Sequence, residues 1–118
     1  MFARFFKPEE FRCPCCGEVK IDPLLVSMLD AAREMAGVPF IITSGYRCER
    51  HNREVGGKPD SAHLKGLAAD IATSSAEERY KIFEALIRVG FRRLGIGKDF
   101  VHADIDPRKP QGLLWLYD

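Results

Sequence analysis

The spacing of apolar positions along the chain predicts two helices. The first follows Asp22 and Pro23, a pair suited to an N-cap and a first helical turn, and Gly37 ends it. Its apolar positions recur at helical spacing and are Leu24, Leu25, Met28, Leu29, Ala32 and Met35 or Ala36. The second helix begins at a capping box from Ser75 to Glu78, runs to about Val89 and stops at Gly90. Its expected apolar stripe is Tyr80, Phe83, Leu86, Ile87 and Val89.

Apolar runs of a different kind predict strands over residues 38–43, 67–72, 93–97, 100–105 and 113–117. Trp115 and Tyr117 alternate with leucines in the last run, so we expect them in the core. Residues 44–60 form a long polar stretch, and a loop of that length in a small domain is more often functional than idle. One helix before the strands and one among them, joined mostly by short turns, predicts an α+β fold. We expect a largely antiparallel sheet flanked by helices.

Length and composition place limits on the class of protein. A chain of 118 residues predicts a single domain over residues 1–118, and we expect a monomer. A net charge of +1 gives no reason to expect nucleic acid or an anionic membrane as the main partner. No apolar run approaches the roughly 20 residues that span a bilayer, so no membrane insertion is expected. Residues 1–7 show no signal peptide, which predicts synthesis in the cytoplasm.

Candidate chemistry gathers in two segments, residues 61–70 and 100–104. They contain two of the three histidines, His63 and His102, and a carboxylate, Asp70, that follows two alanines and precedes Ile71. Asp70 is therefore expected on a buried strand, where an unpaired carboxylate is costly and needs a cation. Two imidazoles and one carboxylate, with a fourth position left open, are typical of a catalytic zinc site.

The order of several short motifs resembles that of the M15 metallopeptidases. The motifs are Ile42-Thr-Ser-Gly-Tyr-Arg47, His51-Asn52, Val55-Gly-Gly57, Ser61-x-His63-x-x-Gly66-x-Ala68-x-Asp70 and Phe100-Val-His102-x-Asp104. That family includes zinc D-Ala-D-Ala carboxypeptidases and the L-alanyl-D-glutamate endopeptidases of phage lysins. The resemblance extends from about residue 11 to residue 115. It implies an α+β domain shared with the signalling domain of Hedgehog, with one zinc ion held by His63, Asp70 and His102.

The resemblance also suggests residues around the metal. Many M15 enzymes carry an acidic residue three positions before the last histidine ligand, and Asp99 occupies that position here. Asp99 is thus our first candidate for the general base. Asp104 is the alternative base, although it could instead orient a ligand imidazole. Arg47 is expected near the scissile carbonyl or a substrate carboxylate, with a structural ion pair as the alternative. Ser61 is a candidate for binding the peptide backbone, or for ordinary turn chemistry.

The four cysteines invite a second metal site at Cys13, Cys15, Cys16 and Cys48. We interpret them otherwise, because the cluster does not read as the C-x₂₋₄-C of a zinc knuckle and no matching second pair follows. Adjacent Cys15 and Cys16 would also rarely face the same ion. Small buried side chains in a tight turn are the simpler interpretation. A disulfide from Cys48 to the cluster depends on the redox compartment.

Together these features predict a zinc peptidase that hydrolyses amide bonds in the peptide stems of bacterial peptidoglycan. The sequence leaves open whether the bond is cut by a carboxypeptidase or an endopeptidase. A phage lysin released to the wall through a holin would suit the chain, as would a prophage product. The alternative is a phage structural or wall-binding module on the same fold that has lost catalysis.

Overall fold

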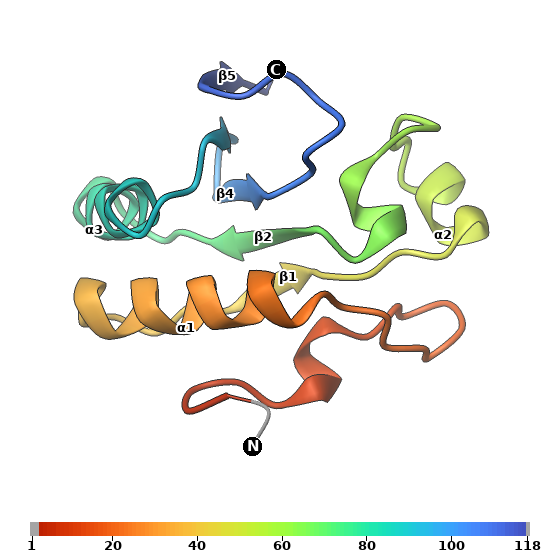
Figure 1. The fold of residues 1–118 in the computed structure, drawn as a ribbon, viewed down its shortest axis with the longest axis horizontal. Coiled ribbons are helices and arrows are strands. Elements are labelled where there is room, and N and C mark those ends of the chain that lie inside the picture. Colours follow the sequence, from red (N-terminus) through yellow and green to blue (C-terminus); the bar gives the residue numbers. More distant parts are fainter. Residues whose placement is uncertain (1–2, 118) are drawn as a thin grey trace.

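The computed structural model describes residues 3–117 and has an α+β fold, as predicted. Its elements are η1 (Pro8–Phe11), α1 (Pro23–Ala36), β1 (Ile42–Ser44), α2 (Glu49–Glu54), η2 (Ala62–Lys65), β2 (Ala68–Ala72), α3 (Ala76–Arg88), β3 (Arg93–Ile96), β4 (Phe100–Asp104) and β5 (Leu113–Leu116), where η marks a 3₁₀ helix. The five strands form one sheet in the order β1-β2-β4-β3-β5. Every pairing is antiparallel except that of β3 with β5. In the view of Figure 1, α3 lies to the left of the strands and α2 lies to the right of them.

The two faces of the sheet differ because successive side chains of a strand point to opposite sides. One face belongs to the hydrophobic core, where Ile71 and Val101 are fully buried with α1 and α3. Their strand neighbours Asp70 and His102 therefore lie on the other face, although both are also largely buried. The core includes Leu25 and Leu29 from α1, Ile82 and Leu86 from α3, and Ala69, Leu94 and Ala103 from the sheet.

The predicted helix caps are present at α1 and α3. The Asp22 carboxylate accepts a hydrogen bond from the Leu24 amide at 2.8 Å, and the Ser75 hydroxyl accepts one from the Glu78 amide at 3.1 Å. The apolar stripe of α3 was predicted wrongly in part. Ile82, Ala85 and Leu86 are its buried residues, whereas Tyr80 is 63% exposed and Ile87 is 49% exposed. Both stripes have helical spacing, so packing against α1 decides which one is buried.

Two other segments differ from the sequence prediction. The strand expected over residues 38–43 is only β1, Ile42–Ser44, consistent with the missing amide donor of Pro39. The expected polar loop over residues 44–60 contains the short helix α2, whose N-cap is the sulfur of Cys48. Its six residues, Glu-Arg-His-Asn-Arg-Glu, carry no apolar stripe, so periodicity gave no signal for it.

The expectation that Trp115 and Tyr117 belong to the core was wrong. They lie at or just beyond β5, at the edge of the sheet, and Tyr117 is 42% exposed. The ring centroids of Trp115 and Tyr117 lie 5.5 and 6.3 Å from the ring centroid of His102. The two aromatic residues therefore flank the polar face of the sheet, the face that carries Asp70 and His102. Gly95 permits this approach, because a Cβ at that position would lie 2.5 Å from Trp115 Nε1. Among the described residues, no helix is long and apolar enough to cross a membrane.

Candidate active site

A row of residues across the sheet builds the polar site. In the strand register, Asp70 of β2 pairs with both Ser44 of β1 and His102 of β4, and His102 also pairs with Gly95 of β3. His63 reaches the same place from η2, which the Ser61 side chain caps and Gly66 ends. Gly66 has a φ of +69°, and a Cβ there would lie 1.8 Å from the carbonyl oxygen of Lys20. The tight turn between His63 and β2 therefore requires glycine.

The three predicted ligands converge in space. Asp70 Oδ1 lies 2.9 Å from His102 Nδ1 and 3.3 Å from His63 Nε2. One ligand atom from each residue lies within 4.8 Å of those from the other two, and all three residues are buried. Two ligand atoms bound tetrahedrally at about 2.1 Å from an ion are about 3.4 Å apart. The observed separations are therefore compatible with one shared metal ion.

The hydrogen bonds of His63 define which ring nitrogen faces this point. Its Nδ1 lies 2.7 Å from the carbonyl oxygen of Gly45, which only accepts hydrogen bonds, so Nδ1 is the donor. In the neutral ring Nε2 then carries the lone pair. This buried nitrogen has no hydrogen-bond partner among residues 3–117. A buried acceptor that faces a carboxylate is unfavourable alone and is satisfied by a cation.

His102 is also held by one ring nitrogen and faces Asp70 with the other, but here Nε2 is the donor and Nδ1 faces Asp70. Its Nε2 lies 2.7 Å from Asp104 Oδ2 and its Nδ1 faces Asp70. A neutral imidazole donates to only one of these carboxylates, and the bond to Asp104 leaves the Nδ1 lone pair directed at Asp70. His63 Nε2, His102 Nδ1 and an oxygen of Asp70 are thus three acceptors directed at one another. Such a donor set fits a metal ion.

Electrostatic effects within this cluster agree with that assignment. Burial lowers the pKa of His63, which favours its neutral, metal-binding form. Burial alone would raise the pKa of Asp70, but the adjacent His102 and His63 imidazoles outweigh it and lower that pKa well below the ordinary range. Burial also opposes charge on His102, yet its hydrogen bonds to Asp104 and Asp70 raise its pKa. His102 therefore favours a positive charge at this position, as either a proton or a metal.

Arg47 lies next to the three ligands. Its Nη2 is 3.4 Å from Asp70 Oδ2, its Nε donates to the Ser44 hydroxyl, and its Nη1 donates to Asn52 Oδ1. Burial lowers the pKa of Arg47, and the nearby Asp70 charge opposes that shift. Asn52 was named within a sequence motif but given no role; it is buried and also donates to the Lys58 carbonyl. The guanidinium is thus held in one orientation before a substrate arrives.

Asp104 and Asp99 occupy different positions relative to this cluster. Asp104 is buried, and besides His102 it accepts hydrogen bonds from Arg93 Nε at 2.8 Å and the Asp106 amide at 3.1 Å. Asp99 is exposed in the turn before β4, and its backbone carbonyl accepts from the Thr73 amide. Its carboxylate makes no ion pair or hydrogen bond with the described residues, and it does not line the cavity at the ligands. The structure joins Asp104 to the ligands and leaves Asp99 apart from them.

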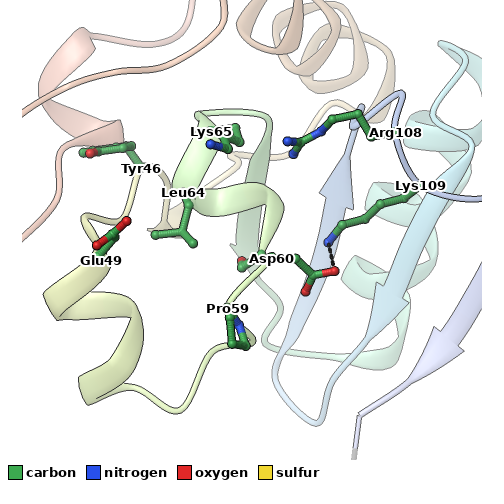
Figure 2. Close-up of a pocket in the computed structure, with 9 residues that line it drawn as sticks. Tyr46, Glu49, Pro59, Asp60, Leu64, Lys65, Arg108 and Lys109 are labelled. Carbon is green, nitrogen blue, oxygen red and sulfur yellow. Dashed lines mark ion pairs between the residues drawn. The ribbon is translucent and has the colours of Figure 1, made fainter.

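A cavity of about 850 Å³ lies over the polar face and is lined by the three ligands, Arg47, Ser61 and Asp104. A smaller cavity of about 400 Å³ adjoins it and shares Asp60, Ser61 and Lys109 with it. Figure 2 shows the smaller cavity, with Lys109 paired to Asp60 at its edge and Arg108 and Lys65 nearby. The Ser61 hydroxyl accepts from the His63 amide at 3.2 Å, so Ser61 has at least a turn-forming role.

The fold and the convergent ligand atoms define a candidate metal-dependent hydrolase site. A family model described as Peptidase M15 matches residues 4–104. The chain therefore belongs to the M15 peptidases, a metal-dependent family of peptidases. No curated protein matches the chain. The family assignment and the geometry agree on a peptidase whose candidate metal ligands include His63, Asp70 and His102.

We predict that His63→Ala lowers the metal content by one equivalent per chain. The change removes the unpartnered Nε2, and two remaining ligands hold a metal ion much more weakly than three. Elemental analysis after dialysis gives the measurement, and His51→Ala, which alters the histidine outside the cluster, is the control. An unchanged metal content in His63→Ala, with the variant folded, would show that this cluster holds no ion.

Proposed function

We propose that the protein is a zinc-dependent peptidase that hydrolyses amide bonds in the peptide stems of bacterial peptidoglycan. The observation that supports it best is the convergence of His63 Nε2, His102 Nδ1 and Asp70 Oδ1 beside a cavity. Nitrogen and oxygen ligands from three residues suit zinc in a catalytic site. When bound, zinc supplies Lewis-acid activation of water and of the scissile carbonyl.

The charges around the cavity support a peptide substrate that carries carboxylates. Arg47, Lys58 and Lys109 line the cavity. The Asp70 and Asp104 carboxylates in the same cavity are engaged with histidines and arginines, and Arg93 pairs with Asp104. Asp60 also lines the cavity, with its carboxylate 3.9 Å from Lys109 Nζ, so a substrate carboxylate would compete with Asp60 for Lys109. Peptidoglycan stems carry free carboxylates beside their amide bonds, which these cations could bind.

Arg47 is proposed to stabilise negative charge that develops on the scissile carbonyl. Its contacts with Ser44, Asn52 and Asp70 fix the guanidinium before binding, and fixed donors need little reorganisation during the reaction. The Ser61 hydroxyl lines both cavities and is proposed to bind the substrate backbone. The alternative role of Arg47, a clamp for a substrate carboxylate, uses the same forked donors.

The general base remains a proposal drawn from the resemblance, with Asp99 first and Asp104 as the alternative. The three hydrogen bonds of Asp104 favour a positioning role, in which it fixes His102 with Nδ1 toward the metal. The Asp99 carboxylate is free to accept a proton, but a substrate or a rearranged turn would have to bring it to the reacting water. We propose that the protein acts on the wall as a monomer, after release from the cytoplasm by an agent such as a phage holin.

The proposed function is tested with purified, zinc-loaded protein and isolated sacculi. We expect new amino groups to appear, with fragments whose masses show cleavage within the stems and identify the bond. His63→Ala should release none, and chelator should abolish release by the wild type. If a folded, zinc-bearing wild type releases nothing from sacculi of several stem types, the alternative of an inactive wall-binding module gains support, and a sedimentation assay would detect it.

A second prediction separates the base from the positioning residue. Asp99→Asn should retain metal and lower kcat by roughly 10²-fold, the usual contribution of general-base catalysis. Asp104→Asn should weaken metal binding by roughly 10–100-fold, because it removes the partner that orients His102. Metal titration and steady-state kinetics at saturating zinc distinguish the two. A nearly wild-type Asp99→Asn, together with a metal-loaded but inactive Asp104→Asn, would mean that Asp104 is the base.

A third prediction concerns the guanidinium of Arg47. Arg47→Lys should lower kcat more than it changes KM, because an ammonium lacks the forked donors and the contact strengthens in the transition state. Arg53→Lys, an exposed change on α2, is the matched control. A raised KM with an unchanged kcat in Arg47→Ala would indicate a carboxylate clamp. A lowered melting temperature with unchanged kinetics would leave Arg47 only a structural role.

A further inference from the structure

The four cysteines gather at a second place in the structure, away from the histidines. Cys13 and Cys16 belong to the turn after η1, and Cys48 stands at the start of α2. Their three sulfur atoms lie within 4.8 Å of one another, and Cys13 Sγ is 3.6 Å from Cys48 Sγ. Cys15 lies in the same turn, next to Cys16. All four are free thiols.

This arrangement corrects the interpretation of the cysteines as packing residues. Cys13 is buried, but Cys15 and Cys16 are exposed and add nothing to the core. Cys13 and Cys16 in fact have the C-x₂-C spacing of a zinc knuckle, which adjacent Cys15 obscures. The sequence shows no second pair because Cys48, far along the chain, supplies the next sulfur.

The backbone of this turn holds the sulfur atoms together. The Gly17 amide donates to the Cys13 carbonyl at 2.8 Å, the Cys13 amide donates to the Glu18 carbonyl, and Gly17 has a φ of +76°. Backbone amides also point at sulfur, from Cys48 to Cys13 Sγ and from His51 to Cys48 Sγ, each at 3.4 Å. Amide donors favour thiolates, which are the form that binds metals.

We propose that Cys13, Cys16 and Cys48 bind a structural zinc ion. Thiolates select soft or borderline ions such as zinc, and three of them supply most of a tetrahedral site. Binding releases the thiol protons to solvent. The site is independent of the proposed peptidase chemistry, because it shares no ligand with His63, Asp70 and His102.

A metal at this place would secure the segment that shapes the active site. Cys48 directly follows Arg47, and the Tyr46 amide donates to the Phe11 carbonyl at 2.9 Å. Gly45, in the same segment, holds His63 through its carbonyl. A zinc ion shared by Cys13 and Cys48 would tie the N-terminal turn to residues 45–48. It would thereby position Arg47 and the Gly45 carbonyl without touching substrate.

Metal content and cobalt spectra of the full-length chain test the proposal. Protein purified with zinc and reductant should contain two zinc ions, and Cys48→Ser and His63→Ala should each contain one. Cobalt-loaded wild type and His63→Ala should both show the thiolate-to-cobalt charge-transfer band, and Cys48→Ser should lose it. One zinc in the wild type, removed by His63→Ala, would overturn the proposal. Two zinc ions in Cys48→Ser would do the same. Cys15→Ser, which alters the thiol outside this group, is the control and should keep both zinc ions and the band.

A measurement on the wild type covers the case in which a cysteine variant fails to fold. Zinc should protect the exposed Cys16 from an alkylating reagent, and chelator should expose it, as read by mass spectrometry of peptides. Equal alkylation with and without zinc would overturn the proposal, as would an intramolecular disulfide from Cys13 to Cys48 in the reduced preparation. Loss of peptidase activity in His63→Ala, with cysteine protection retained, separates this site from the proposed function.

Discussion

The pairing of β2 with β4 is the constraint on which the site depends. Its register sets Asp70 opposite His102, and sets Ile71 opposite Val101 on the other face. Because side chains alternate along a strand, a slip of one residue would turn the side chains of the shifted strand over and move either Asp70 or His102 into the hydrophobic core. The same slip would expose its strand neighbour Ile71 or Val101, both of which are fully buried. The core that favours the fold therefore also fixes the register that assembles the ligands.

The face of the sheet that carries Asp70 and His102 has more buried acceptor atoms than donors, and a metal ion can satisfy them. Asp70 and Asp104 are largely buried, and burial of a carboxylate is costly without a cation or donors. Asp104 is satisfied within the protein by Arg93, His102 and a backbone amide. Asp70 has Arg47 on one oxygen, while its other oxygen faces two imidazole nitrogens. The Gly45 carbonyl and the Asp104 carboxylate accept hydrogen bonds from the two imidazoles, which leaves the lone pairs of His63 Nε2 and His102 Nδ1 directed at Asp70. A cation between these two nitrogens and the Asp70 oxygen would satisfy all three acceptors.

Much of the fold could be predicted from the sequence because its signals are local. The caps at Asp22 and Ser75 and the spacing of apolar residues locate α1 and α3. The motif containing His63 and Asp70, with His102 downstream, predicted a candidate ligand set whose three residues the structure brings together. The supporting residues could not be found in this way. Asn52 and Arg93 act through contacts with residues distant in sequence, and the Gly45 carbonyl has no side chain to signal it. The exposure of Cys15 and Cys16 and the closeness of Cys48 to Cys13 could not be predicted, because they depend on how the turn and α2 are placed in space.

Anomalous diffraction at the zinc absorption edge, from crystals of the zinc-loaded protein, tests most directly whether the convergent acceptor atoms form a metal site. We predict an anomalous peak within bonding distance of His63 Nε2, His102 Nδ1 and an Asp70 oxygen. His63 Nδ1 should still donate to the Gly45 carbonyl, and His102 Nε2 should still donate to Asp104. No peak among these atoms in a crystal that contains zinc elsewhere would contradict the account. A zinc ion bound instead through His102 Nε2, with Asp104 displaced, would contradict it as well.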